Sequence, residues 1–92
     1  MRLIWSDDGI QERNDIFAFI SADNPVAAVA IDQILSERAR NLLEFPNIGR
    51  PGILPDTREL TVHPNYRLIC ELVRYNVHIL NVVHARRNWP EG

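Results

Sequence analysis

The chain has 92 residues, of which 46% are hydrophobic and 24% charged, with a formal net charge of −2 at pH 7. These values are ordinary for a soluble globular protein and argue against intrinsic disorder. No apolar run is long enough for a transmembrane helix and the first residues lack a signal-peptide pattern, so we expect a cytoplasmic protein with one domain over residues 1–92. The acidic balance is unusual for a protein that binds nucleic acid directly, since such proteins are commonly basic.

The histidines and the one cysteine do not predict a metal site. Cys70 lies in an apolar stretch and should be a buried, inert thiol, because free cysteine is commonly buried. His78 and His84 would share one face of a strand, but six residues along a strand span roughly 20 Å. The sequence contains no CxxC or HExxH pattern. We therefore expect neither a metal nor a cofactor.

The chain begins with a predicted strand followed by a predicted helix. Residues 1–5 form a short, mostly apolar run, and Ser6 then fits the N-cap of a helix that should end near residues 21–23. Apolar residues recur at helical spacing and should form the packing face: Ile10, Ile16, Phe17 and Ile20. The charged residues between them should face solvent: Glu12, Arg13 and Asp15.

A second helix should start at Asn24 and Pro25 and run to about Phe45, with asparagine as N-cap and proline at the first helical position. Its core stripe should contain Ile31, Ile34, Leu35 and Leu42. Because the link between the helices is short, they should form an antiparallel hairpin. Residues 45–56 contain three prolines and two glycines, which predicts an irregular connector without regular structure.

The last third of the chain predicts three strands rich in Val, Ile, Leu and Tyr. The expected strands are 58–62, 66–73 and 77–84, with turns at 63–65 and 74–76 and a tail over 85–92. The apolar centre of the middle strand predicts burial on both of its faces. The order of strand, two helices and three strands indicates an α+β fold in which the helical hairpin packs against an antiparallel meander.

The same third carries a cluster of cationic and aromatic residues: Arg58, His63, Tyr66, Arg67, His84, Arg86, Arg87 and Trp89. Some of them should converge at one edge of the sheet, where arginine could bind phosphate, histidine could move a proton and an aromatic ring could stack on a base. Solvated arginines at strand ends would give the same pattern, and Arg58 could simply pair with Glu59 or Glu71. Trp89 would either hold the tail on the fold or contact a partner.

Taken together, these segments resemble the ParE branch of the RelE/ParE superfamily, the toxins of type II toxin–antitoxin systems. The resemblance rests on Arg58-Glu59-Leu60, His63-Pro64-Asn65-Tyr66, Leu68-Ile69, Val77-x-Ile79 and Val83-His84-x-Arg86-Arg87-x-Trp89-Pro90. Earlier segments agree, namely the Trp-Ser step at 5–6, the Asp-Asn-Pro run at 23–25 and the Pro-x-x-Gly-Arg-Pro-Gly loop at 46–52. The resemblance implies a RelE/ParE-like fold and a growth-inhibiting toxin. It also implies a cognate antitoxin that neutralises the toxin, with operator DNA bound only through the antitoxin complex.

Members of this superfamily differ in mechanism: ParE-like toxins inhibit DNA gyrase, whereas RelE-like toxins cut mRNA on the ribosome. The closer likeness to ParE and the net charge of −2 favour gyrase inhibition. The partner-binding candidates are then Arg58, Tyr66, His84, Arg86, Arg87 and Trp89. If the chain is instead a ribosome-dependent nuclease, the candidates for catalysis are Arg58, His63, Tyr66, Arg67, His84 and Arg86. A third interpretation is a non-toxic binding module, and none of the three involves a membrane.

Overall fold

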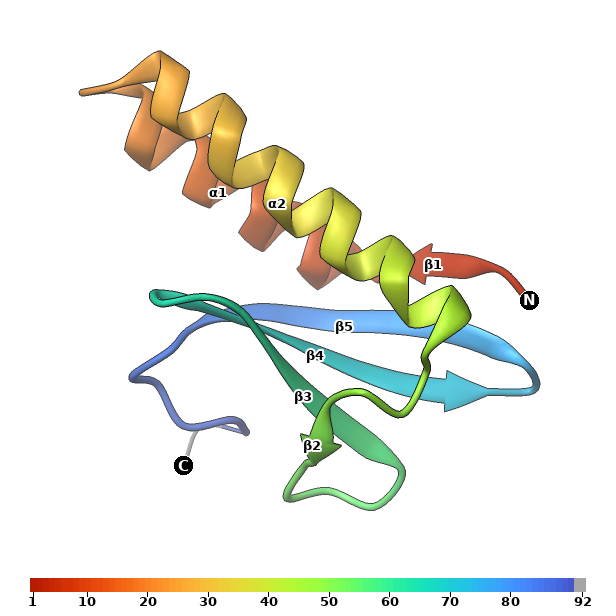
Figure 1. The fold of residues 1–92 in the computed structure, drawn as a ribbon. Coiled ribbons are helices and arrows are strands. Elements are labelled where there is room, and N and C mark those ends of the chain that lie inside the picture. Colours follow the sequence, from red (N-terminus) through yellow and green to blue (C-terminus); the bar gives the residue numbers. More distant parts are fainter. Residues whose placement is uncertain (91–92) are drawn as a thin grey trace.

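A computed structural model of the protein describes residues 1–90; Glu91 and Gly92, the end of the predicted tail, lie outside the described residues. Two helices pack on one face of a five-stranded sheet (Figure 1). In chain order the elements are β1 (Leu3–Trp5), α1 (Asp7–Ser21), α2 (Pro25–Glu44), β2 (Arg50–Pro51), β3 (Thr57–His63), β4 (Tyr66–Val73) and β5 (Asn76–His84). The predicted α+β fold of an N-terminal strand, a helical hairpin and an antiparallel meander is confirmed.

Both predicted helix starts are confirmed by their capping bonds. The Ser6 hydroxyl accepts a hydrogen bond from the Gly9 N–H at 2.9 Å, and the Asn24 side-chain oxygen accepts one from the Ala27 N–H at 3.0 Å. These bonds satisfy backbone donors that have no partner within the helix. Pro25 follows Asn24 as the first residue of α2. Local residue chemistry therefore determines where each helix begins.

The strands follow the order β1-β5-β4-β3-β2. The meander of β3, β4 and β5 is antiparallel, while β1 lies parallel to β5 and pairs with it from Val77 to Ile79. The expectation that residues 45–56 lack regular structure was wrong at one place. Arg50 and Pro51 form β2, which pairs with β3 at the edge of the sheet, where a proline is tolerated because its missing N–H can face away from the ladder.

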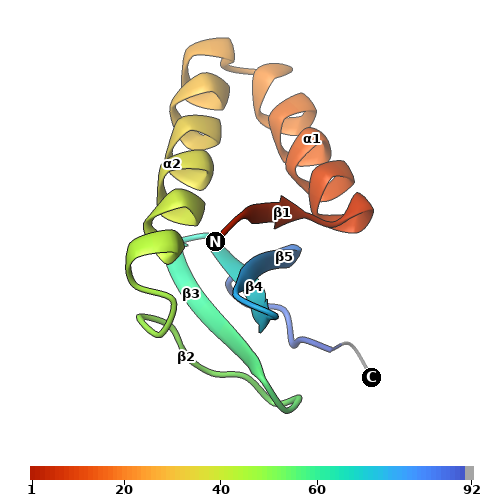
Figure 2. The same ribbon diagram turned by 90° about the vertical axis from the view of Figure 1, so that its right-hand side faces the viewer.

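The core lies between the helices and the sheet. It consists of Leu35, Ala39, Leu42, Leu60, Leu68, Cys70, Val77, Ile79 and Val82. The opposite face of β4 is buried as well, since Ile69 has no exposed surface and pairs with Glu59 and Asn81 on the neighbouring strands. The predicted burial of this strand on both faces is confirmed for its centre. The residues after β5 run beneath the sheet on the side away from the helices (Figure 2).

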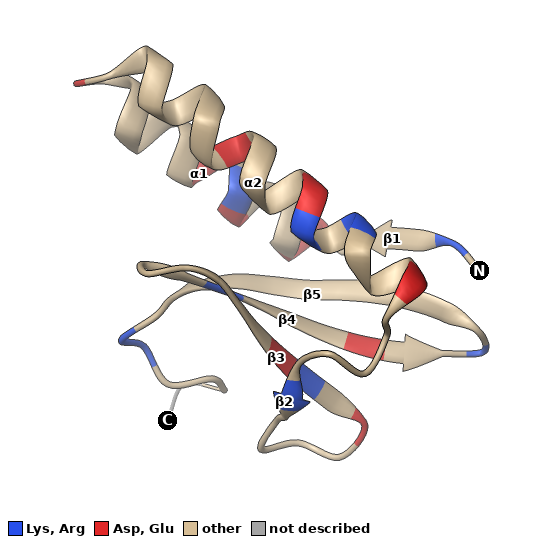
Figure 3. Cartoon of the chain, viewed as in Figure 1, with Lys and Arg blue, Asp and Glu red and all other residues tan. Residues whose placement is uncertain are grey.

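The far end of the helical hairpin stands clear of the sheet in both views (Figures 1 and 2). Phe19 and Val26 there are each 80% exposed. Ile10 and Phe17, which were expected to face the core, keep 46% and 38% of their surface exposed, so that part of the predicted packing face does not reach the core. This end carries almost no charge apart from Asp23 in the turn (Figure 3).

Candidate functional site

Three aromatic rings meet at one end of the meander. The register places Tyr66 opposite both His63 and His84, and its ring centroid lies 5.8 Å from that of His63 and 5.9 Å from that of His84. The Nδ1 atom of His63 accepts the Asn65 N–H at 3.1 Å, and that of His84 accepts the Arg86 N–H at 3.2 Å. Each imidazole therefore keeps its Nε2 atom available for a partner.

Arg58 does not join this ring cluster. It pairs with Cys70 on β4, four residues from Tyr66, which corresponds to about 13 Å along a strand. Its guanidinium donates to the carbonyls of Gly49 at 2.8 Å and Asn47 at 3.3 Å and so ties the connector to β3. From the sequence alone, Arg58 could also pair with a nearby carboxylate, but these bonds go to backbone oxygens.

Cys70 lies in the core, as predicted. Burial raises the pKa of its thiol, and the neighbouring Arg58 opposes that shift only in part. A raised pKa keeps the sulfur protonated, which makes it a poor nucleophile. The predicted burial of this thiol is confirmed.

Arg67, a candidate for catalysis, is a buried residue with only 8% of its surface exposed. It points to the face of the sheet opposite the helices, where its Nη1 atom donates to a carboxylate oxygen of Glu59 at 2.5 Å. Its Nη2 atom donates to the backbone carbonyl of Arg87. Glu59 is also buried and makes a looser contact, at 3.5 Å, with the exposed Arg50. Arg67 therefore connects β3, β4 and the chain after β5, and its guanidinium does not lie at the surface.

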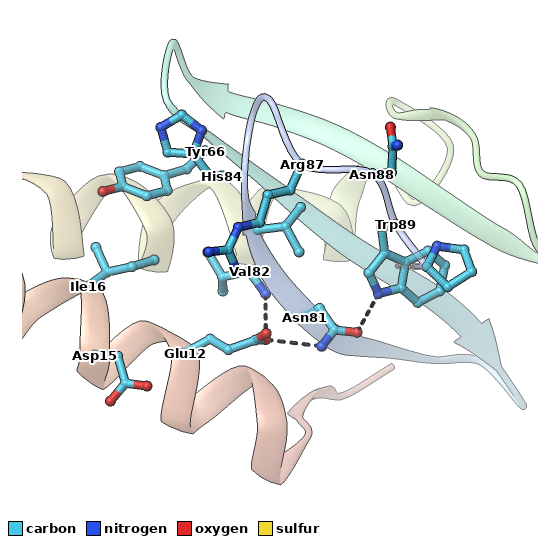
Figure 4. Close-up of a pocket in the computed structure, with 12 residues that line it drawn as sticks. Glu12, Asp15, Ile16, Tyr66, Asn81, Val82, His84, Arg87, Asn88 and Trp89 are labelled. Carbon is cyan, nitrogen blue, oxygen red and sulfur yellow. Dashed lines mark hydrogen bonds between the residues drawn. The ribbon is translucent and has the colours of Figure 1, made fainter. Parts of the chain in front are cut away.

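The remaining candidates follow β5. Arg86 is exposed beside the rings. Arg87 lines a hollow of about 530 Å³ between α1, the end of β5 and the following chain, together with Tyr66 and His84 (Figure 4). Trp89 is half-buried in the same hollow and donates its indole N–H to the side-chain oxygen of Asn81 at 2.8 Å. Of the two roles considered for Trp89, this bond gives it the first, which is to hold the tail on the fold.

Glu12 was expected to face solvent, yet it is bonded to the sheet. One carboxylate oxygen accepts hydrogen bonds from the Val82 N–H and the Asn81 side-chain amide, both at 3.0 Å (Figure 4). The signal that could have found it is a mismatch of lengths: the first strand is too short to pair with all of residues 77–84, so the remaining edge needs other partners.

Within residues 1–90, no three His, Cys, Asp or Glu side chains gather closely enough to hold a metal ion. No helix in this part of the chain has the length and apolar character needed to cross a membrane. The arrangement thus offers three rings, Tyr66, His63 and His84, with the exposed Arg86 beside them. Tyr66 and His84 also line the hollow, which has carboxylates on its other wall. Such a surface can bind a partner through stacking and charge-assisted hydrogen bonds.

Several known proteins resemble this chain in sequence or in fold. A model of the family described as ParE toxin of type II toxin-antitoxin system, parDE, matches residues 3–89. A curated protein of Sinorhizobium fredii (strain NBRC 101917 / NGR234), named "Putative toxin Y4kP", is 32% identical over 90 residues, which cover 98% of this chain and 94% of that protein. A solved structure titled "Chromosomal ParDE TA system from P. aeruginosa" shares the fold with a TM-score of 0.80 at 20% identity, covering 91% of this chain and 95% of the other. The chain therefore belongs to the ParE toxin family of type II toxin–antitoxin systems.

Proposed function

We propose that the free chain arrests bacterial growth by inhibiting DNA gyrase in the cytoplasm, and that a cognate antitoxin encoded beside it neutralises it. The chain belongs to the ParE family, and the observation that carries this proposal is that the residues considered for nuclease catalysis do not lie together. Arg58 holds the connector and Arg67 is buried against Glu59, so neither guanidinium can reach a phosphate placed at the rings. A surface that lacks these cations is better suited to binding than to phosphate chemistry.

The surface that we assign to the target consists of Tyr66, His84, Arg86 and Arg87. Tyrosine and arginine are enriched among the residues that dominate binding energy at protein interfaces. Tyr66 is partly buried and fixed by its two ring contacts, so it loses little conformational freedom on binding. The exposed Arg86 adds hydrogen-bond donors at the edge of the surface.

For the antitoxin, the exposed apolar end of the hairpin is the favoured docking area. Monomeric soluble proteins rarely leave such apolar surface uncovered, and a flexible amphipathic segment is a common partner for surfaces of this kind. The similar structure from P. aeruginosa, titled as a ParDE system, supports a toxin–antitoxin pairing. On this proposal the antitoxin complex, and not the toxin alone, binds operator DNA.

A ribosome-dependent nuclease is the second candidate, because the Tyr66 ring contacts both His63 and His84. A histidine could move a proton of the RNA while Arg86 contacts its phosphate. The net charge of −2 argues against docking into ribosomal RNA.

A supercoiling assay with purified chain, gyrase, ATP and relaxed plasmid tests the first proposal. We expect the chain to prevent supercoiling, and we expect cleaved plasmid to accumulate after detergent and protease treatment. A eukaryotic topoisomerase I reaction serves as the control, since an effect there would mean that the chain acts on the DNA itself. Full gyrase activity in excess chain would reject gyrase as the target.

If gyrase is not inhibited, mapping of cuts in ribosome-bound mRNA decides the alternative. Cleavage by the wild type and its loss in His84→Ala would support the nuclease, with Tyr75→Ala as the control, because Tyr75 is 82% exposed in the turn between β4 and β5.

Growth of a host that expresses this gene alone separates both toxins from a non-toxic binding module, which would leave growth unchanged. Coexpression of the neighbouring antitoxin gene should restore growth. Val26→Glu should weaken that rescue if the antitoxin docks on the hairpin, whereas Tyr75→Glu, equally exposed at the other end of the molecule, should not.

A further inference from the structure

Residues 85–90, which we call the strap, follow β5 without forming a helix or strand, yet they are fixed to the rest of the chain. At the start of the strap, the Ala85 N–H donates to the Asn65 carbonyl at 2.8 Å and the Arg87 N–H donates to the His84 carbonyl at 3.0 Å. Two further ties come from side chains that lie away from the ring cluster, namely Arg67 and Asn81. The strap carries Arg86 and Arg87, so its position decides where these cations lie.

The first tie is the buried guanidinium of Arg67. It bonds to Glu59 on one side and to the Arg87 carbonyl on the other, and its Nε atom is buried without a partner among the described residues. Buried ion pairs contribute little net stability compared with apolar residues of the same size, because both charges lose their hydration. The bond to Arg87 gives this pair a different role, which is to fix the path of the strap.

The second tie passes through Asn81 and is oriented by Glu12. A carboxylate can only accept hydrogen bonds, so Glu12 requires the NH2 group of the Asn81 amide to point toward it. The amide oxygen must then point the other way, where it accepts the indole N–H of Trp89 (Figure 4). The bond from the Val82 N–H holds the Glu12 carboxylate in place. Glu12 on α1 thus determines the position of Trp89 without touching it.

We propose that Arg67 and Glu12 are positioning residues of the toxin: they hold the strap so that Arg86 and Arg87 lie beside Tyr66 and His84 as one preorganised target-binding surface. The expected effect on inhibition rests on the proposed function, whereas the hydrogen bonds that hold the strap do not depend on it. Binding to a flexible strap would cost the ordering of its residues, which a fixed strap avoids. Loss of either tie should therefore weaken inhibition even though neither residue contacts the target.

The test uses the full chain in two measurements. The first is the indole N–H resonance of Trp89 in a ¹H–¹⁵N spectrum, where Trp5 supplies the only other indole signal and Trp5→Phe assigns the two. In Glu12→Ala the exchange of the Trp89 indole proton with water should rise by at least about tenfold, the equivalent of one lost hydrogen bond, while the Trp5 signal stays unchanged. Glu12→Gln, whose side-chain oxygen can still accept, should restore protection.

The second measurement is the concentration of chain that gives half-maximal gyrase inhibition. It should rise by about tenfold in Glu12→Ala and stay within about twofold in Glu12→Gln. Asp15→Ala is the matched control, because Asp15 lines the same hollow from the same helix and accepts its hydrogen bond from Gln11, on that helix, and not from the sheet. Arg67→Lys keeps a charge beside Glu59 but cannot hold both partners in the same fork, so it should loosen the strap as Glu12→Ala does.

An unchanged Trp89 indole in Glu12→Ala and Arg67→Lys would overturn the proposal. Faster exchange of the Trp89 indole proton in these variants, with inhibition as strong as in the wild type, would overturn it as well. If the wild type does not inhibit gyrase at all, the proposed function fails, and the indole measurement together with growth arrest by the same variants still decides whether the strap matters.

Discussion

At the scale of single residues, the ion pair between Arg13 and Asp32 connects the two helices. The guanidinium binds the carboxylate through two bonds of 2.7 and 2.9 Å and also lies 4.9 Å from the centre of the Trp5 ring. The hydrogen bond from Arg13 lowers the pKa of Asp32, and burial opposes this only in part. The pair therefore stabilises the hairpin only while Asp32 is ionised.

Asp32→Asn should reduce the free energy of unfolding by about 0.5–1 kcal/mol at pH 7, a small value because both side chains remain partly exposed to solvent. Since the pKa of Asp32 is lower in the folded than in the unfolded chain, its contribution is complete above the unfolded value of about 4 and is lost as the pH falls through the folded value. Urea denaturation at pH 7 and pH 3 measures this. Asp23→Asn, in the exposed turn, is the control, and a difference independent of pH would contradict the prediction.

The sequence predicted that some of the candidate residues would converge at one edge of the sheet, but it did not predict where the side chains of Arg67 and Glu12 point. Tyr66 and His84 meet as strand pairing suggested. Arg67 alternates with Leu68 and so points away from the helices, yet only the position of the strap turns that face into a buried one. Glu12 became a bonding partner because β1 ends early and leaves an N–H of β5 unpaired. Both outcomes depend on contacts between residues far apart in the chain.

At the scale of elements, the turn between β4 and β5 is strained. Arg74 and Tyr75 have φ angles of 50° and 68°, in the left-handed region that ordinary side chains avoid. A two-residue hairpin turn of this kind favours the Asn-Gly sequence. Neither residue is needed for packing, since both are exposed and Tyr75 retains 82% of its surface.

The double variant Arg74→Asn, Tyr75→Gly should therefore raise the free energy of unfolding by about 1–2 kcal/mol. Thermal and urea denaturation would measure the gain. Tyr75→Ala is the informative comparison, because alanine keeps the strain and should give no increase. An equal gain in both variants would mean that loss of the exposed ring, and not relief of strain, is the cause.

The connector between α2 and β3 contains a second constraint. A Cβ atom added at Gly49 would lie 2.7 Å from the carbonyl oxygen of Glu59, a backbone atom that cannot move without disturbing β3. Gly49→Ala should thus destabilise the protein by about 1–3 kcal/mol, the usual cost of overpacking. Asn47→Ala is the control, because Asn47 contributes its carbonyl and not its side chain to Arg58. A Gly49→Ala protein as stable as the wild type in urea would contradict the prediction.

Elements whose ends are marked by local chemistry could be predicted well. Ser6, Asn24 and Pro25 place both helix starts because each cap bonds within three residues of itself. The pairing of β1 with β5 joins residues more than 70 positions apart and leaves no local signal. β2 was missed for a related reason: a proline-rich segment becomes a strand only because β3 offers an edge to it.

At the scale of the whole molecule, stability depends on one layer of side chains between the helices and the sheet. A chain of this length buries roughly 60% of its unfolded surface and is stable by roughly 5–15 kcal/mol. The other face of the sheet carries the strap, which Arg67 binds, and among residues 1–90 the far end of the hairpin has no contact with the sheet. Substitutions in the layer should therefore affect the entire fold, whereas those at its rim should not.

Leu68 and Leu72 provide a matched pair for this comparison, since they lie four residues apart on β4 and point to the same face. Leu68 is completely buried and Leu72 is 46% exposed. Leu68→Ala should lower the free energy of unfolding by about 3–5 kcal/mol, because it leaves a cavity that the surrounding core cannot fill, whereas Leu72→Ala should cost less than about 1 kcal/mol. Urea denaturation followed by circular dichroism measures both. Equal losses would mean that the end of β4 is as important to the core as its centre, and the single-layer description would then be wrong.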